Sequence, residues 1–168
     1  GGYRGLINVK VSPQKLSVIN YAFVDIKDNR AWLHREATDT VNLRRLNELK
    51  KQNPALKIVI SIGGWTWSGK FSDAVLTDTS RAAFAASAAA IVSKYDLDGI
   101  DIDWEYPGRP GLAGNVYRPE DKQNFTLMFR DLRHALDSIK QQTKKDYLLT
   151  TAVGGFASFL DNTEMGKA

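Results

Sequence analysis

Cysteine is absent from the 168-residue sequence, so disulfide bonds and thiolate metal sites are excluded. No apolar run approaches the length of about 20 residues needed to span a bilayer, and no secretory signal pattern opens the chain. The formal net charge is only +4, and no basic stripe alternates with aromatic residues as in proteins that bind nucleic acids. We therefore expect neither a membrane nor a nucleic acid as a partner.

The composition is that of a globular protein, with 43% hydrophobic and 25% charged residues in a length that suffices for one domain. Residue patterns predict strands alternating with helices: strands at 17–26, 57–64, 98–104 and 147–155, helices at 40–52, 79–95 and 118–142, and a turn at 28–32. This order predicts an α/β fold with a parallel sheet covered by helices. Two architectures fit, an open doubly wound sheet or part of a (β/α)8 barrel, which when complete takes about 250 residues.

The segment DGIDIDWEYP, residues 98–107, places four acidic side chains within eight positions. Side chains alternate between the faces of a strand, so Asp101, Asp103 and Glu105 are predicted to share one face. They run toward the carboxyl end of the strand, where parallel α/β folds bind ligands. Asp98 breaks the alternation and is expected in the loop that enters the strand. Ile100, Ile102 and Trp104 are then expected to face the covering helices.

Carboxylates this close together titrate as a coupled set, and repulsion with partial burial raises the pKa of at least one of them. A glutamic acid with a raised pKa keeps its proton near neutral pH and can donate it in catalysis. The same residues also suit a magnesium or calcium site. The third possibility is a purely structural network of acids. Such networks are usually neutralised by arginine or lysine, and neither residue type occurs within this strand.

This segment resembles the DxxDxDxE signature of glycoside hydrolase family 18, the family of many chitinases. SIGGW at 61–65 is similar to the family's motif on its third strand, and INYAF at 19–23 to its second strand. The resemblance implies a (β/α)8 TIM barrel. Residues 1–168 would then be an incomplete catalytic domain that covers roughly strands 2 to 5, with the first strand and strands 6–8 lacking.

The resemblance further implies hydrolysis of β-1,4 linkages between N-acetylglucosamine units of chitin by a retaining, substrate-assisted mechanism. Glu105 would donate the proton and later act as base toward water. Asp103 would hydrogen-bond the acetamido N–H of the sugar and stabilise an oxazolinium ion, and Asp101 would lie deeper and tune Asp103. The family needs no metal or other cofactor, and this chain alone is expected to be inactive.

Three aromatic residues are candidates for binding sugar rings, whose flat C–H faces pack on aromatic surfaces. The resemblance makes Trp65 a stacking platform on the minus side of a cleft, and Tyr106 is expected to line that cleft. Phe23 would form the floor under the distorted sugar, with packing in the core as the alternative. Family members often contain cis peptide bonds without proline near the cleft, and these are expected at Ala22–Phe23 and Glu105–Tyr106.

The implied partners are chitin or N-acetylglucosamine oligosaccharides, together with the remainder of the barrel in the full-length chain. Secretion is expected because polymeric chitin lies outside the cell. Three alternatives remain: a lectin-like relative, which usually lacks the terminal glutamate; an endo-β-N-acetylglucosaminidase acting on N-linked glycans; and a doubly wound domain with an acidic cation site.

Overall fold

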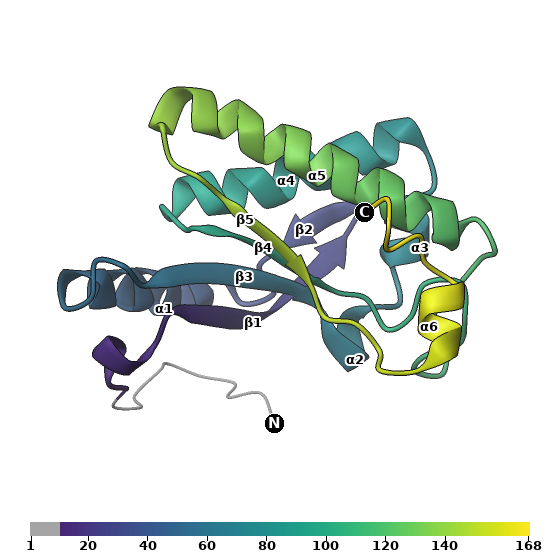
Figure 1. Ribbon diagram of the computed structural model, residues 1–168, viewed down its shortest axis with the longest axis horizontal. Coiled ribbons are helices and arrows are strands. Elements are labelled where there is room, and N and C mark those ends of the chain that lie inside the picture. The colour runs from purple at the N-terminus through teal and green to yellow at the C-terminus, as the bar shows by residue number, and fades with distance from the viewer. Residues whose placement is uncertain (1–10) are drawn as a thin grey trace.

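The computed structural model describes residues 11–168 and contains one mainly parallel sheet covered by helices (Figure 1). The strands are β1 (Val18–Lys27), β2 (Arg30–Trp32), β3 (Lys57–Gly63), β4 (Gly99–Asp103) and β5 (Leu148–Thr151). The longer helices are α1 (Glu36–Glu48), α4 (Asp78–Lys94) and α5 (Asp121–Thr143). The shorter ones are α2 (Gly64–Trp67), α3 (Phe71–Ala74) and α6 (Ala157–Asp161), with the 3-10 turns η1 (Pro13–Lys15) and η2 (Leu49–Lys51).

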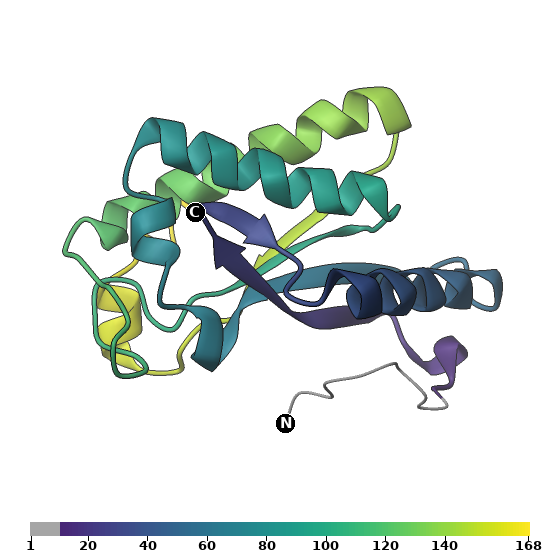
Figure 2. The ribbon, with the colours of Figure 1, turned by 180° about the vertical axis from the view of Figure 1, so that it is seen from behind.

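The strand order is β2-β1-β3-β4-β5, in which β1, β3, β4 and β5 are parallel neighbours. Each parallel pair is joined through a helix, as the predicted alternation requires. Figures 1 and 2 show α4 and α5 side by side against the sheet, with α1 on the same side near β1 and β3. The carboxyl ends of the four parallel strands consequently meet at one edge.

The core lies between the sheet and these helices, where alternate side chains of the central strands are buried. On β3 these are Ile58, Ile60 and Ile62, and on β4 and directly after it they are Ile100, Ile102 and Trp104. The Trp104 ring stacks on Phe71, with centroids 5.0 Å apart, and also approaches Phe125. The prediction that one face of residues 100–104 packs against helices is therefore confirmed.

Two predictions differ from the structure at the amino-terminal side of the sheet. Residues 28–32 were predicted as a turn only, whereas β2 pairs with β1 in an antiparallel hairpin. Its turn residues Asp28 and Asn29 have φ values of 51° and 59°, the left-handed conformation that tight hairpins require and that these residue types tolerate. The first long helix starts at Glu36 and not at 40. The prediction missed its first turn because that turn is polar and lacks the apolar spacing by which the helix was predicted.

At the amino ends of the strands, Asp98 is buried directly before β4, as expected for a loop residue entering the strand. Its carboxylate lies 2.6 Å from Lys50 Nζ and 2.9 Å from Lys145 Nζ, and it accepts a 2.7 Å hydrogen bond from the Ile58 N–H. Burial alone would raise the pKa of Asp98, but the hydrogen bonds from Lys50, Ile58 and Lys145 lower it below its usual value. This acid is part of a structural network, and its lysine partners come from other segments of the chain.

No helix within residues 11–168 combines the length and apolar character that crossing a membrane requires.

Candidate active site

The three predicted carboxylates lie at the carboxyl end of β4, with Asp101 deepest. Asp101 is 6% exposed, whereas Asp103 and Glu105 are partly exposed. The register places Ser61 of β3 and Thr150 of β5 opposite Asp101. Each of these hydroxyl groups donates a 2.7 Å hydrogen bond to a different carboxylate oxygen of Asp101. The innermost acid is therefore held between two neighbouring strands.

The raised pKa that was expected within this set falls on Asp103. Burial and the charges of Glu105 and Asp101 raise the pKa of Asp103 from 3.8 to about 6.

The backbone of β3 approaches Asp103 closely, since a Cβ atom on Gly63 would lie only 2.3 Å from the Asp103 carbonyl oxygen. Gly63 also has a φ of 108°, so only glycine fits this position without strain.

The pKa of Asp103 gives a prediction for stability. Because the folded state binds this proton more tightly than the unfolded state, Asp103 stabilises the fold below about pH 4, and this contribution is lost as the pH rises through about 6. Asp103→Asn should therefore raise the free energy of unfolding at pH 8 by about 1–2 kcal/mol, allowing for partial exposure. Urea unfolding of the purified protein between pH 4 and pH 8 measures this effect. An unchanged pH dependence in the variant would contradict it.

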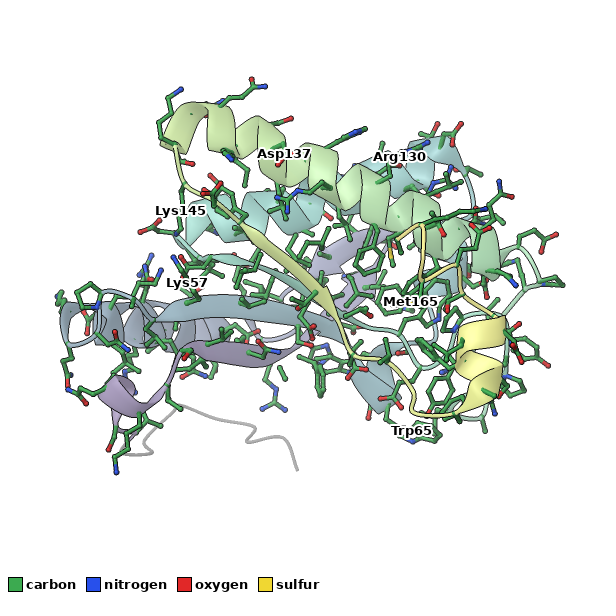
Figure 3. All side chains as sticks on the ribbon, in the orientation of Figure 1. Lys57, Trp65, Arg130, Asp137, Lys145 and Met165 are labelled. Carbon is green, nitrogen blue, oxygen red and sulfur yellow. The ribbon has the colours of Figure 1, made fainter. Side chains whose placement is uncertain are left out.

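The three candidate aromatic residues also lie at the carboxyl edge of the sheet. Phe23 is 40% exposed in this chain, and its ring covers Gly64, where an added Cβ would lie 2.7 Å from the ring. Trp65 is 48% exposed, and its ring centroid lies 6.4 Å from that of Tyr106 in an edge-on arrangement. Figure 3 shows Trp65 at the end of the molecule opposite to Lys57 and Lys145, which mark the amino ends of the strands.

Tyr106 directly follows Glu105, and its hydroxyl group interacts with the Glu105 side chain. Burial, the Glu105 charge and a hydrogen bond with the Glu105 carboxylate raise the pKa of Tyr106. The Tyr106 ring also contacts Phe156 edge-on, with centroids 5.3 Å apart. Both expected cis peptide bonds, Ala22–Phe23 and Glu105–Tyr106, are cis in the structure.

Four residues that hold the acidic strand were not identified from the sequence: Ser61, Ser68, Asn115 and Thr150. Ser61 and Thr150 occupy strand positions whose register with Asp101 becomes visible only when the strands are paired. Ser68 and Asn115 contact the main chain of Glu105, and no pattern in the sequence reports contacts between loops.

Among residues 11–168, no three histidine, aspartate or glutamate side chains converge in an arrangement that could hold a metal ion.

Comparison with known proteins identifies the fold. The family described as Glycosyl hydrolases family 18 matches residues 2–168. Chitinase A1 from Niallia circulans is 51% identical over 126 residues, which cover 75% of this chain and 18% of that protein. The solved structure of chitinase ChiW from Paenibacillus sp. str. FPU-7 matches with a TM-score of 0.88 at 38% identity, covering 94% of this chain and 20% of that one.

A family 18 N-acetylglucosaminidase from Paenibacillus barengoltzii matches with a TM-score of 0.85 at 41% identity, covering 94% of this chain and 45% of the solved chain. The present chain thus spans less than half the length of each of these three proteins. Of the two predicted architectures, the partial (β/α)8 barrel is confirmed and the doubly wound sheet is wrong. The chain belongs to glycosyl hydrolase family 18.

Proposed function

We propose that residues 1–168 form part of a chitinase-type catalytic domain that hydrolyses β-1,4 linkages between N-acetylglucosamine units. The observation that carries this proposal is the row Asp101, Asp103 and Glu105, which runs from buried Asp101 inside β4 to the partly exposed Glu105, two residues after the strand ends. An exposed Trp65 and the Tyr106 ring stand beside the outermost acid. Relatives that share the fold are described as chitinases.

In the proposed reaction, Glu105 gives its proton to the glycosidic oxygen as the bond to the anomeric carbon breaks. The acetamido oxygen of the same sugar attacks that carbon and forms an oxazolinium ion. Asp103 accepts a hydrogen bond from the acetamido N–H and stabilises the positive charge. Both roles require ionised Asp103 and hence a pH near or above its pKa of about 6. Asp101, fixed by Ser61 and Thr150, supports Asp103 from below.

The second step regenerates the acid. Glu105, now ionised, removes a proton from a water molecule that attacks the anomeric carbon from the face left by the leaving group, and the bond between this carbon and the acetamido oxygen breaks, which restores the acetamido group. Two inversions at this carbon give net retention of configuration. Glu105 therefore acts once as acid and once as base.

We propose that the remainder of the barrel in the full-length chain completes the sugar-binding cleft and that residues 1–168 alone are inactive. Chitin or its oligosaccharides are the proposed ligands. We also propose secretion, because polymeric chitin lies outside the cell; the related ChiW is described as cell-surface-expressed.

One observation favours a second candidate, removal of single N-acetylglucosamine units, since the Paenibacillus barengoltzii relative is described as an N-acetylglucosaminidase. The two candidates share the carboxylate row and differ in product length. Product chromatography on chitin oligosaccharides distinguishes them, because chain-internal cleavage gives oligosaccharides and stepwise removal gives the monosaccharide.

The mechanism predicts dependence on the acetamido group. The full-length protein should cleave N-acetylglucosamine oligomers and release the β-anomer first, whereas fully deacetylated oligomers should react at least about 100-fold more slowly, because they lack the internal nucleophile. Proton NMR of fresh products reads the anomer. Initial release of the α-anomer, or equal rates on both substrates, would contradict the proposed mechanism.

A further inference from the structure

The main chain of Glu105 is held by side chains from two different loops. The Glu105 N–H donates a 2.8 Å hydrogen bond to Ser68 Oγ, and Asn115 Nδ2 donates a 3.2 Å hydrogen bond to the Glu105 carbonyl oxygen. Ser68 directly follows α2, after β3, and Asn115 belongs to the loop between β4 and α5. Both polar groups of the Glu105 backbone are thus occupied by protein.

Ser68 is built into the site as a fixed acceptor. It is 1% exposed, and its Oγ lies 2.8 Å from the Gly64 carbonyl oxygen and 3.1 Å from that of Asp103. The hydroxyl proton is directed to a carbonyl oxygen, which leaves a lone pair for the Glu105 N–H. One buried hydroxyl group therefore joins the turn after β3 to the end of β4.

Asn115 is held in place by its own loop. Its N–H bonds to the Leu112 carbonyl oxygen, and the neighbouring Val116 N–H bonds to the Gly69 carbonyl oxygen. The loop also packs directly against the acid, because a Cβ atom on Gly111 would lie 2.1 Å from the Glu105 carbonyl oxygen. The segment from Gly111 to Asn115 thus packs against the main chain of Glu105.

We propose that Ser68 and Asn115 are positioning residues, a clamp that fixes the Glu105 backbone and thereby the place from which its carboxyl group reaches the glycosidic oxygen. This inference rests on the proposed function, in which Glu105 is the acid. A displacement of about 1 Å at a catalytic group can cost about 100-fold in rate, whereas binding of the sugar chain depends on other contacts. Loss of the clamp should therefore lower kcat more than it changes KM.

The test compares Ser68→Ala, Asn115→Ala and Ser68→Thr in the full-length enzyme on a chitin oligosaccharide. Both alanine variants should lose about 10- to 100-fold in kcat with KM within about threefold of the parent value. Ser68→Thr retains the hydroxyl group and should recover most of the lost kcat. If Ser68→Ala does not fold, Asn115→Ala carries the test alone, because Asn115 is partly exposed in a loop.

Ser87 of α4 provides a matched control. Its Oγ accepts a 2.8 Å hydrogen bond from the Ala31 N–H of β2 and lies 2.7 Å from the Phe84 carbonyl oxygen, the same pattern as at Ser68 but away from Glu105. Ser87→Ala should therefore keep the parent kcat. Parent-level kcat in both Ser68→Ala and Asn115→Ala, or an equal kcat loss in Ser87→Ala, overturns the clamp. These results differ from failure of the proposed function, in which the parent enzyme itself would not hydrolyse the oligosaccharide.

Discussion

Glu105→Gln is expected to reduce kcat of the full-length enzyme on chitin oligosaccharides by about 100- to 10,000-fold, the contribution of a positioned acid and base. Glutamine has nearly the same shape and leaves the backbone contacts to Ser68 and Asn115 unchanged. It has no acidic proton to give to the glycosidic oxygen and cannot accept one from water. Oligosaccharide affinity should remain within a few-fold of the parent value, since the aromatic residues are unaltered.

Two measurements check this expectation: initial rates of oligosaccharide cleavage and titration calorimetry of oligosaccharide binding to the variant. Glu48→Gln is a suitable control, because Glu48 is exposed on α1 and the change replaces a carboxyl group by an amide in the same way. A Glu105→Gln enzyme that turns over near the parent level would dismiss Glu105 as the acid. If the variant lost both oligosaccharide binding and turnover, the substitution would have disturbed the cleft. That result would contradict the expectation that kcat falls while affinity is kept.

Asp98→Ala is expected to destabilise the fold by about 3–5 kcal/mol, the range seen when one member of a buried ion pair is removed. The carboxylate is 3% exposed, and its loss leaves Lys50 and Lys145 without their buried counter-charge. The Ile58 N–H also loses its acceptor at the start of β3. Because three segments meet at this one carboxylate, the cost is far above that of a surface ion pair.

Asp98 also gives a pH dependence opposite in sign to that of Asp103. Its pKa is lowered in the folded state, so its stabilising contribution is present above the ordinary aspartate pKa and is lost as the pH falls below about 4. Urea unfolding of parent and variant at pH 7 and at pH 3 should show a large difference at pH 7 and a smaller one at pH 3.

Asp146→Ala is the matched control for this experiment, because Asp146 pairs with Lys140 at 2.5 Å but is 88% exposed. Solvent screens such a pair, so the variant should unfold with nearly the parent free energy. Equal destabilisation by Asp98→Ala and Asp146→Ala would show that burial of the Asp98 pair is not what makes it important.

The parallel part of the fold could be predicted from sequence because its signals are local. The alternation of apolar and acidic residues at 98–104 gave the buried face of β4, and the buried side chains of Ile100, Ile102 and Trp104 confirm it. The hairpin strand β2 could not be predicted in the same way. It is only three residues long, Arg30–Trp32, and depends on a left-handed turn and on the Ala31–Ser87 hydrogen bond to α4.

The sequence was less informative about how the acids are held. It predicted that Asp101, Asp103 and Glu105 share a face, but the distribution of pKa values depends on burial, which placed the raised value on Asp103. The partners of Asp98 lie 48 and 47 residues away along the chain, at Lys50 and Lys145. Only the folded sheet brings such distant charges together.

The two ends of β4 have a consequence for engineering an enzyme that carries this chain. Asp98 secures the amino end, whereas the acids from Asp101 to Glu105 occupy the stretch leading to the opposite end. Libraries randomised around Lys50 and Lys145 can thus be screened for heat tolerance while the proposed catalytic edge of the sheet is left untouched. Substitutions in the loop that wraps the Glu105 carbonyl group, from Gly111 to Asn115, would instead disturb the position of the proposed acid.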